Sequence, residues 1–286
     1  MANWTIGDVK ITRIVEFEAA LPIGGEGTMV EAAYPEALQK IDWLQPHFAT
    51  PEGHAKMAVQ ALLIETPTKR IIVDTCVGNE KKRDNPFFNN LQTPFLKHME
   101  EAGWPRDSVD TVLCTHLHVD HVGWNTMLVD GEWVPTFPKA RYLVGAREWA
   151  HWQTESDGGN GAVLADSVQP IFDAGLADLI NEDHVICDEV SVRPTPGHTP
   201  GHISVVISSK GESAVITGDL MHHPSQIAHP EWSSGFDTNK SQADDTRASF
   251  VAEMADADTL VIGTHFATPA GGHIVRDGQS YRLKLD

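Results

Sequence analysis

Four short apolar runs in this sequence are each followed, within a few residues, by a side chain that can bind a metal ion. The runs are residues 111–114, 190–194, 214–217 and 260–262, and the side chains after them are His116, His198, Asp219 and His265. Short runs rich in β-branched residues are typical of buried strands. Because a sheet holds the loops beyond its strand ends rigidly, binding groups of α/β proteins gather there. The pattern therefore predicts a sheet-based fold with a site at the strand ends.

Other segments alternate between strand-like and helix-like patterns. We expect a strand over residues 9–17, and two strands within residues 58–74 that flank a turn at residues 66–69. Because strands and helices interleave through most of the chain, the sequence favours the α/β class.

Two helices are predicted from apolar spacing and end signals. The first is the segment LQTPFLKHMEEAG, with Leu91, Phe95 and Met99 on one face and Gly103 at the C-terminal end. The second opens at residues 241–244, where a capping pattern precedes an apolar stretch.

Composition and charge limit the class of protein. The chain has 286 residues, of which 41% are hydrophobic and 21% charged, so a folded globular chain is expected. It contains no repeat, low-complexity segment or linker, and we expect one domain over residues 1–286. The net charge of −19 disfavours nucleic acids and anionic membranes as partners. The one short basic run, residues 81–83, is expected to be a solvated loop.

The cysteines and the N-terminal residues bear on the expected location of the protein in the cell. Cys76, Cys114 and Cys187 are far apart and form no CxxC pair, which disfavours a disulfide framework or a structural zinc site. The first residues lack a signal-peptide pattern, and no stretch approaches the roughly 18 apolar residues that span a bilayer. We therefore expect a cytoplasmic protein.

The segment THLHVDH, residues 115–121, is the densest group of metal-binding side chains. His116 and His118 are two residues apart, so in an extended loop they point the same way and reach one metal ion. Asp120 and His121 follow the turn and can face a second ion. With His198, Asp219 and His265 this makes seven candidate ligands, which fits two ions sharing one carboxylate. The remaining histidines are treated as ordinary surface or core residues, except three named below.

The order of these motifs resembles the metallo-β-lactamase-fold superfamily of hydrolases. The resemblance covers HxHxDH, the Gly-His within TPGHTPGH, the strand ending in Gly-Asp and the final Gly-Thr-His, from about Ile71 to His265. It implies a four-layer αβ/βα sandwich with the metals in a groove at one edge of two sheets. By this resemblance one ion takes His116, His118 and His198, the other takes Asp120, His121 and His265, and Asp219 bridges them.

The resemblance also implies supporting residues and a mechanism. The first histidine of TPGHTPGH is the ligand, so His202 is expected to be a supporting or structural residue, and Asp74 is expected to support a ligand histidine. Two divalent ions, chiefly Zn²⁺ with Mn²⁺, Fe²⁺ and Co²⁺ as alternatives, lower the pKa of a bridging water towards about 7. The resulting hydroxide attacks the substrate, while Asp120 holds the nucleophile and carries its proton.

Several branches of the superfamily fit poorly. His118 stands where the flavodiiron branch has an acidic residue, and Asp219 stands where the best-known true β-lactamases have cysteine or no equivalent. The 21 residues after His265 leave no room for the C-terminal helical domain of glyoxalase II. The net charge of −19 disfavours the nuclease branches.

The remaining resemblance is to the N-acyl homoserine lactonases and the methyl parathion hydrolase-like enzymes. It implies a dinuclear-metal hydrolase that cleaves a neutral, moderately apolar lactone or ester, with quorum quenching as the lactonase role. The alternatives are an organophosphate triester or aryl ester hydrolase, and a non-catalytic metal-binding protein of the same fold. Lactonases commonly have a tyrosine three residues past the bridging aspartate, where this chain has His222. Either His222 is the catalytic donor or the substrate is not that lactone, and His222 and His223 are the candidate site residues besides the ligands, against their being ordinary loop residues.

The substrate pocket and the assembly are the last expectations. An N-terminal extension of about residues 1–55 is expected to shape the pocket or a homodimer contact, the latter by similarity to the lactonases. Five aromatic residues are expected either to line the pocket or to cap the core: Trp43, Phe48, Phe87, Phe88 and Trp124.

Overall fold

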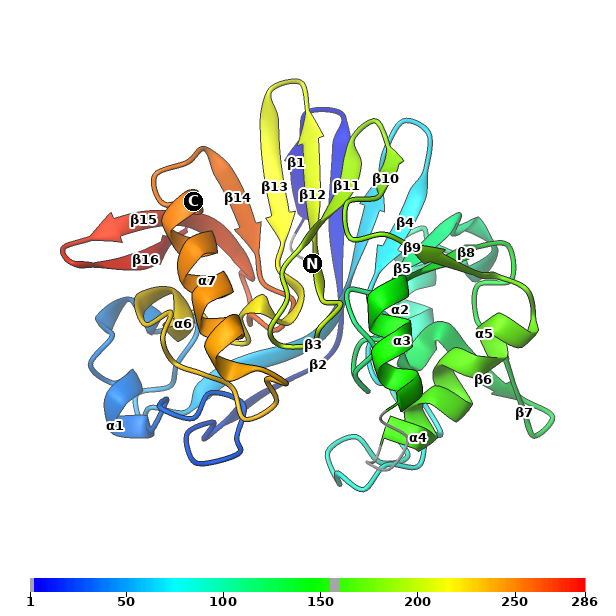
Figure 1. Cartoon of the computed structure of the whole chain (residues 1–286), viewed down its shortest axis with the longest axis horizontal. Helices are drawn as coiled ribbons and strands as arrows, with labels where there is room; N and C mark the ends of the chain where they lie inside the picture. The colour runs from blue at the N-terminus through cyan, green and yellow to red at the C-terminus, as the bar shows by residue number, and fades with distance from the viewer. Residues whose placement is uncertain (1–2, 155–159, 286) are drawn as a thin grey trace. The chain divides into compact units, whose positions relative to one another are not determined.

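Two seven-stranded sheets carry the secondary structure of this chain, whose computed structural model describes residues 3–154 and 160–285 (Figure 1). The chain divides into two compact units. The first comprises residues 3–17 and 59–182, and the second comprises residues 18–58 and the chain from residue 183 onwards. The single domain expected from the sequence stays a prediction.

The first sheet lies mainly in the first unit and is half antiparallel and half parallel. Its order is β1 (Asn3–Ile6), β2 (Val9–Leu21), β3 (Ala55–Glu65), β4 (Arg70–Val73), β5 (Thr111–Leu113), β8 (Arg141–Gly145) and β9 (Ala177–Ile180). Strands β4, β5, β8 and β9 run parallel. Parallel strands are covered on both faces, which explains the continuous apolar runs at residues 71–73 and 111–113.

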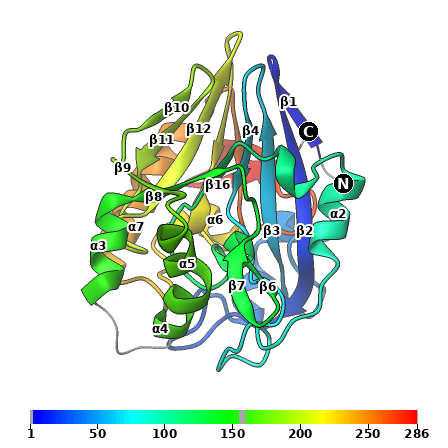
Figure 2. The same ribbon diagram turned by 90° about the vertical axis from the view of Figure 1, so that its right-hand side faces the viewer.

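The helices of the first unit pack around one apolar core. They are α2 (Phe95–Glu101), α3 (Ala146–Thr154), α4 (Asn160–Val163) and α5 (Gln169–Asp173), with a π-helical turn at Leu164–Val168 and 3₁₀ turns at Arg106–Ser108 and Gly123–Asn125. Helix α3 contacts β8 and β9, and α5 lies beside the hairpin of β6 (Thr126–Val129) and β7 (Glu132–Pro135) (Figure 2). The core includes Phe95, Val112, Tyr142 and Trp152.

The second sheet lies in the second unit and is antiparallel except at one pair. Its order is β10 (Val185–Cys187), β11 (Val190–Pro194), β12 (Ile203–Ser209), β13 (Glu212–Ile216), β14 (Thr259–Ile262), β15 (Gly271–Asp277) and β16 (Ser280–Lys284). Strands β13 and β14 pair in parallel. A parallel pair needs a long crossover, and helix α7 (Lys240–Met254) lies in that connection.

The helices of the second unit are short apart from α7. They are α1 (Pro35–Leu38) and α6 (Ser225–Ala228), with 3₁₀ turns at Asp42–Leu44 and Gly218–Leu220. Helix α7 contacts β15, and α6 contacts β16 (Figure 1). The buried residues of α7 include Arg247, Phe250, Val251 and Met254, which follow helical spacing and form one face.

The strand predictions are confirmed. Residues 9–17 lie within β2, residues 58–74 contain the β3–β4 hairpin, and the four apolar runs are β5, β11, β13 and β14. Each of those four strands is followed by a candidate ligand in the next loop, as expected.

The helix predictions need two corrections. Helix α2 begins at Phe95, so Leu91 lies outside it, because the residue before Pro94 is disfavoured in helical conformation and Thr93 N donates to Asn79 (2.7 Å). Gly103 follows the helix end in the left-handed conformation (φ +81°), as predicted. Helix α7 begins at Lys240, and its cap is the side chain of Asn239, which accepts from Gln242 N (3.1 Å).

The basic run is a loop with Lys82 exposed, as expected, but the expectation is wrong for Lys81, which is buried, and Arg83 is half-buried. The side chain of Lys81 is fully buried, donates to Thr126 Oγ1 (2.8 Å) and lies 3.7 Å from the ring centre of Trp133. Arg83 makes a two-pronged bond with Asp166 (2.6 and 2.8 Å). Burial lowers the pKa of Lys81 to about 7, although the nearby Asp166 opposes this shift.

Two further expectations concern the cysteines and the membrane. Cys76 and Cys114 are buried free thiols, and Cys187 is half-buried. No helix in the described part of the chain is long and apolar enough to cross a membrane.

Candidate metal-ligand clusters

The loop after β5 brings the four ligand candidates of THLHVDH together in the first unit. His116 Nε2 lies 3.0 Å from His118 Nδ1, and the rings of His116 and His121 are 4.0 Å apart. Asp120 Oδ1 lies 3.8 Å from His121 Nε2. His116 and His121 are buried, whereas His118 and Asp120 are partly exposed. The cluster therefore offers three imidazoles and one carboxylate from seven consecutive residues.

Asp74 supports this loop, as expected from the sequence. Its Oδ2 atom lies 2.9 Å from His121 Nδ1, and its Oδ1 atom accepts the backbone N–H of Thr115 (2.8 Å). The carboxylate is completely buried. An acceptor at Nδ1 fixes the tautomer and leaves Nε2 of His121 with its lone pair available to a metal ion.

A second buried carboxylate, Glu148, holds the same loop, and a third, Glu16, joins segments beside it; the sequence reasoning missed both. Glu148 accepts the backbone N–H of Leu117 (3.1 Å) and the indole N–H of Trp152 (2.6 Å). The ring of Trp152 meets His118 edge-on at 5.3 Å.

Glu16 joins several segments around Trp124. It accepts the backbone N–H of Val77 (2.8 Å) and the indole N–H of Trp124 (2.7 Å), and burial raises the pKa of Glu16. Trp124 is buried and its ring stacks on Phe95 at 5.6 Å. Trp124 therefore packs in the core, which was one of its two sequence interpretations.

The second unit gathers two predicted histidine ligands and His222 around the carboxylate of Asp219, the third predicted ligand. Asp219 Oδ2 lies 3.4 Å from His198 Nε2 and 3.2 Å from His222 Nε2. Asp219 Oδ1 lies 3.1 Å from His265 Nε2. All four side chains are buried. The residues come from the ends of β11, β13 and β14, so the sheet brings together positions that are far apart in the sequence.

Each ligand candidate of the second unit has its own support. His198 Nδ1 lies 3.0 Å from Asp237 Oδ1, and His265 Nδ1 lies 2.9 Å from the carbonyl oxygen of Ala58. The backbone N–H of Asp219 donates to His202 Nε2 (2.9 Å). His202 thus has the supporting contact expected for it.

His222 and His223 have different surroundings. Nε2 of the buried His222 lies 3.2 Å from Asp219 Oδ2, whereas Nδ1 has no hydrogen-bond partner among the described residues. The ring is parallel to that of His265 at 6.1 Å. The ring of His223 lies between Phe48 O (2.8 Å) and Ser225 Oγ (2.9 Å). Burial lowers the pKa of His223 to about 4, so it is a neutral structural link.

Both clusters fit a divalent metal ion by composition and spacing. The first cluster contains three candidate imidazole ligands and one carboxylate, and the second contains two and one carboxylate; these donor types suit zinc and neighbouring ions. Tetrahedral zinc with ligands at about 2.0 Å separates its donor atoms by about 3.3 Å. The closest pairs, at 3.0 Å for His116–His118 and 3.1–3.4 Å around Asp219, are near that separation.

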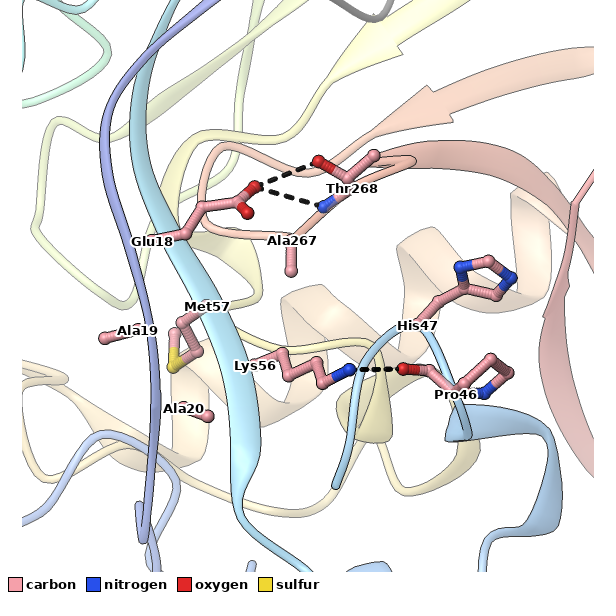
Figure 3. Close-up of a pocket in the computed structure, with 9 residues that line it drawn as sticks. All are labelled: Glu18, Ala19, Ala20, Pro46, His47, Lys56, Met57, Ala267 and Thr268. Atoms are coloured by element: carbon pink, nitrogen blue, oxygen red, sulfur yellow. Dashed lines mark hydrogen bonds between the residues drawn. The ribbon is translucent and has the colours of Figure 1, made fainter. Parts of the chain in front are cut away.

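A pocket of about 490 Å³ lies in the second unit (Figure 3). Its lining comes from the end of β2, the loop at residues 46–47, the start of β3 and the loop after His265. Glu18 accepts from Thr268 Oγ1 (3.0 Å), and Lys56 Nζ donates to Pro46 O (2.7 Å), as Figure 3 shows. These bonds hold the pocket's loops to its strands.

The other predicted pocket aromatics are not among the described residues that line this pocket. Phe48 is buried and meets Phe266 edge-on at 6.2 Å. Phe88 packs against Phe17 at 6.2 Å, Phe87 is exposed, and Trp43 is half-buried in a 3₁₀ turn. Phe48 and Phe88 therefore follow the core-capping interpretation.

The sequence reasoning also missed Asp237 and Arg247. Asp237 lies 39 residues from His198, its contact, so no local pattern marks it. Arg247 carried a signal, because it precedes Phe250, Val251 and Met254 at helical spacing and therefore lies in an apolar stripe.

Comparisons with known proteins identify related sequences and folds. Residues 56–278 match the family described as the metallo-beta-lactamase superfamily. An N-acyl homoserine lactonase of Bacillus sp is 23% identical over 202 residues, which cover 66% of this chain and 74% of that protein.

Solved structures share the fold over nearly the whole chain. The crystal structure of the hydrolase AbOPH of the β-lactamase superfamily has a TM-score of 0.79 at 24% identity, covering 99% of this chain and 97% of that one. The dizinc quorum-quenching lactonase AidC, in complex with a product, N-hexanoyl-L-homoserine, has a TM-score of 0.80 at 20% identity, covering 99% and 96%. The α/β fold expected from the sequence is confirmed.

Proposed function

Since this chain belongs to the metallo-β-lactamase superfamily of hydrolases, we propose that its two ligand clusters bind one pair of divalent metal ions and hydrolyse a neutral lactone. The ligands are the seven residues expected from the sequence: His116, His118, Asp120, His121, His198, Asp219 and His265. The observation that carries the proposal is the carboxylate of Asp219, whose two oxygens face different histidines, His198 on one side and His265 on the other. A carboxylate placed in this way suits a bridging ligand.

The metal ions, chiefly zinc, would supply an activated water and an electrophile for the substrate's carbonyl oxygen. The chain's own residues orient the reaction. Asp74 and Asp237 hold ligand histidines by their Nδ1 atoms, which keeps each Nε2 directed to one place. Asp120 is partly exposed, so it can hold the attacking water and carry its proton to the leaving oxygen.

His222 is proposed as the donor to the substrate. Its ring is buried with Nε2 3.2 Å from Asp219 Oδ2, and its Nδ1 atom has no hydrogen-bond partner among the described residues. A buried donor without a partner is costly unless a ligand supplies one. The substrate's carbonyl oxygen is the acceptor that the proposed reaction provides.

The substrate class follows from the relatives. The Bacillus relative is named as an N-acyl homoserine lactonase, and the AidC structure holds a lactone hydrolysis product. This chain carries His222 where lactonases have tyrosine, an observation that keeps an organophosphate triester or aryl ester as the second candidate. With a lactone as substrate, the role would be quorum quenching.

The pocket of the second unit is proposed to receive the substrate's tail. Residues 18–20 and 46–47 line it and precede residue 56, where the family match begins, so the N-terminal extension would shape specificity. One carboxylate and one ammonium group, Glu18 and Lys56, balance each other, and the small side chains of Ala19, Ala20 and Ala267 suit an uncharged aliphatic chain.

Two further features complete the proposal: a homodimer that uses the N-terminal extension and a cytoplasmic location. Light scattering of the purified protein tests the first, because a monomer at all concentrations would contradict it. Fractionation of cells that produce the protein tests the second.

The test of the proposed function is a substrate panel on the zinc-loaded protein. The panel compares kcat/KM for an acyl-homoserine lactone, an aryl ester, an aryl phosphotriester and a β-lactam. We expect the lactone to be the best substrate. A higher value for the phosphotriester or aryl ester would favour the second candidate. Two bound metal ions with no turnover of any compound would instead favour a non-catalytic metal-binding protein.

Filling the pocket tests the tail assignment. Ala20→Trp should lower kcat/KM roughly tenfold or more for a long-chain lactone and change it little for a short-chain one. Val129→Trp, on an exposed strand position outside the pocket, is the control. An equal effect on both chain lengths would contradict the assignment.

A further inference from the structure

A buried arginine of α7 contacts several segments around the second cluster. Arg247 is fully buried, and its guanidinium donates to the carbonyl oxygens of Leu220 (2.9 Å) and Pro230 (2.7 Å). It also donates to Asp244 (2.9 Å) and lies 3.5 Å from Asp237 Oδ2. Because a buried charge is costly unless it is paired and hydrogen-bonded, these partners fix the guanidinium in one position.

The contact with Asp237 extends to a proposed metal ligand. Asp237 Oδ1 lies 3.0 Å from His198 Nδ1, and Asp237 Oδ2 also accepts the backbone N–H of Ser234 (2.9 Å). The carboxylate therefore lies between the guanidinium and the imidazole, with its negative charge compensated by Arg247. Its orientation sets the direction of His198 Nε2, which faces Asp219 at 3.4 Å.

The contact with Leu220 extends to a second proposed ligand. Leu220 follows Asp219 directly in the 3₁₀ turn Gly218–Leu220. Arg247 holds the carbonyl group on one side of Asp219, and His202 accepts the N–H of Asp219 itself (2.9 Å). The backbone that carries the bridging carboxylate is thus held at both ends.

The start of α7 also packs against the loop that carries His198. Asn239 N donates to Gly197 O (2.9 Å), and Gly197 has a φ of +134°. A Cβ atom on Gly197 would lie 2.3 Å from Ala243 N, so only glycine permits this approach. The helix that holds Arg247 therefore also fixes the chain just before His198.

We propose that Arg247 is a positioning residue for the metal centre, acting on His198 through Asp237 and on Asp219 through the Leu220 carbonyl group. The planar guanidinium meets these acceptors at fixed angles, which the single ammonium group of lysine cannot do. The proposal rests on the metal binding proposed above and adds a residue that touches no ligand itself.

The test is a titration of the metal-free protein with Co²⁺, read from the visible absorption of the bound cobalt. Arg247→Met should weaken cobalt binding about tenfold or more and change the band shape, because loss of a supporting partner loosens ligand geometry. Arg247→Lys should recover only part of the affinity. Thermal unfolding of the metal-free variants measures the structural effect separately.

The matched control is Arg193→Met. Arg193 on β11 bonds Glu253 of the same helix at 2.8 and 2.7 Å and lies 5.8 Å from the ring centre of Phe250. Neither of these two contacts is to a segment that carries a proposed ligand. Its cobalt affinity and spectrum should equal those of the unaltered protein. The same spectral change in this variant would overturn the proposal, because docking of α7 alone would then explain it.

Asp237→Asn provides a second test if Arg247→Met does not fold. It removes the negative charge between Arg247 and His198, and it should change the cobalt spectrum in the same direction. Unaltered spectra and affinities in both Asp237→Asn and Arg247→Lys would overturn the inference. If the unaltered protein binds no cobalt, the proposed function fails instead.

Discussion

The two ligand clusters contain the same donor types but are held in different ways. In the first unit the ligands lie on one seven-residue segment, and three buried carboxylates, Asp74, Glu148 and Glu16, accept from neutral donors around it. In the second unit the ligands follow three separate strands, and one carboxylate, Asp237, is paired with a buried cation, Arg247.

This difference follows from sequence separation. A short loop needs only acceptors for its own donors, since its residues are already close together. Ligands that are 21 and 46 residues apart, as Asp219 is from His198 and from His265, depend on the sheet and on a side chain that reaches several segments. We therefore expect the second cluster to be the more sensitive to single substitutions.

The largest effect is expected for Asp219→Ala. This change removes the only carboxylate that faces both His198 and His265 in the second cluster. Both metal ions should be lost or bound weakly, and kcat/KM should fall by about a thousandfold or more, since several kcal/mol of transition-state stabilisation depend on the ions. Metal analysis after dialysis, together with kinetics, checks this; full metal content with normal turnover would refute the assigned ligands.

The direct comparison of the two clusters is Asp237→Asn against Asp74→Asn. Asp237→Asn removes a negative charge that neutralises the buried Arg247, and it should lower the free energy of unfolding by about 3 kcal/mol. Asp74→Asn breaks contacts with neutral donors and costs about 1–2 kcal/mol. Urea unfolding of the metal-free variants measures both values. Equal losses would mean that the two clusters are supported in the same way.

A smaller and more selective effect is expected for His222→Ala. Both metal ions should be retained, and kcat/KM should fall about 10- to 100-fold, or change in preference between lactone and ester, because a substrate donor is lost. His223→Gln is the control, since His223 contacts Phe48 and Ser225 rather than Asp219. Loss of a metal ion from His222→Ala would make His222 a ligand instead of a donor.

Two pH dependences of stability, one in each unit, are expected as well. Burial lowers the pKa of His223 to about 4, so the unfolded chain binds this proton at a higher pH than the folded chain. The free energy of unfolding should therefore decrease as the pH falls from about 6.5 to 4. Burial lowers the pKa of Lys81 to about 7, so stability should rise between about pH 7 and 10.5. Each slope is at most about 1.4 kcal/mol per pH unit.

The measurement is the difference in unfolding free energy between the unaltered protein and His223→Gln or Lys81→Met at several pH values. A difference for His223→Gln that does not change between pH 6.5 and 4 would mean that His223 is protonated in the folded state. A constant difference for Lys81→Met above pH 7 would mean that the buried ammonium keeps its proton, stabilised by Asp166.

Much of the fold could be predicted because its signals are local. The strands before the ligands are short apolar runs, and the ligand motifs follow them directly, so β5, β11, β13 and β14 were found from the sequence. The start of α2 was missed because Pro94 outweighs apolar spacing. The cap of α7 was assigned to the wrong residue because Asn239 precedes the pattern that was used.

The supports of the candidate site were less predictable. Asp74 was found because the family pattern includes it, whereas Glu16, Glu148 and Asp237 bond to residues far away in the sequence. Lys81 was expected in solvent because a basic run has no local sign of the Trp133 ring that covers it. The tertiary fold decides which polar side chains pair over long sequence separations, so the spacing of residues in the sequence does not predict these pairs.

The most direct test of the account is the number of zinc ions that each chain retains after the metal-free protein is reloaded and dialysed. Two ions per chain, with both lost or weakened in Asp219→Ala, is the result predicted for seven ligands that share one carboxylate. One ion or none in the unaltered protein, or two ions that persist in Asp219→Ala, would contradict it.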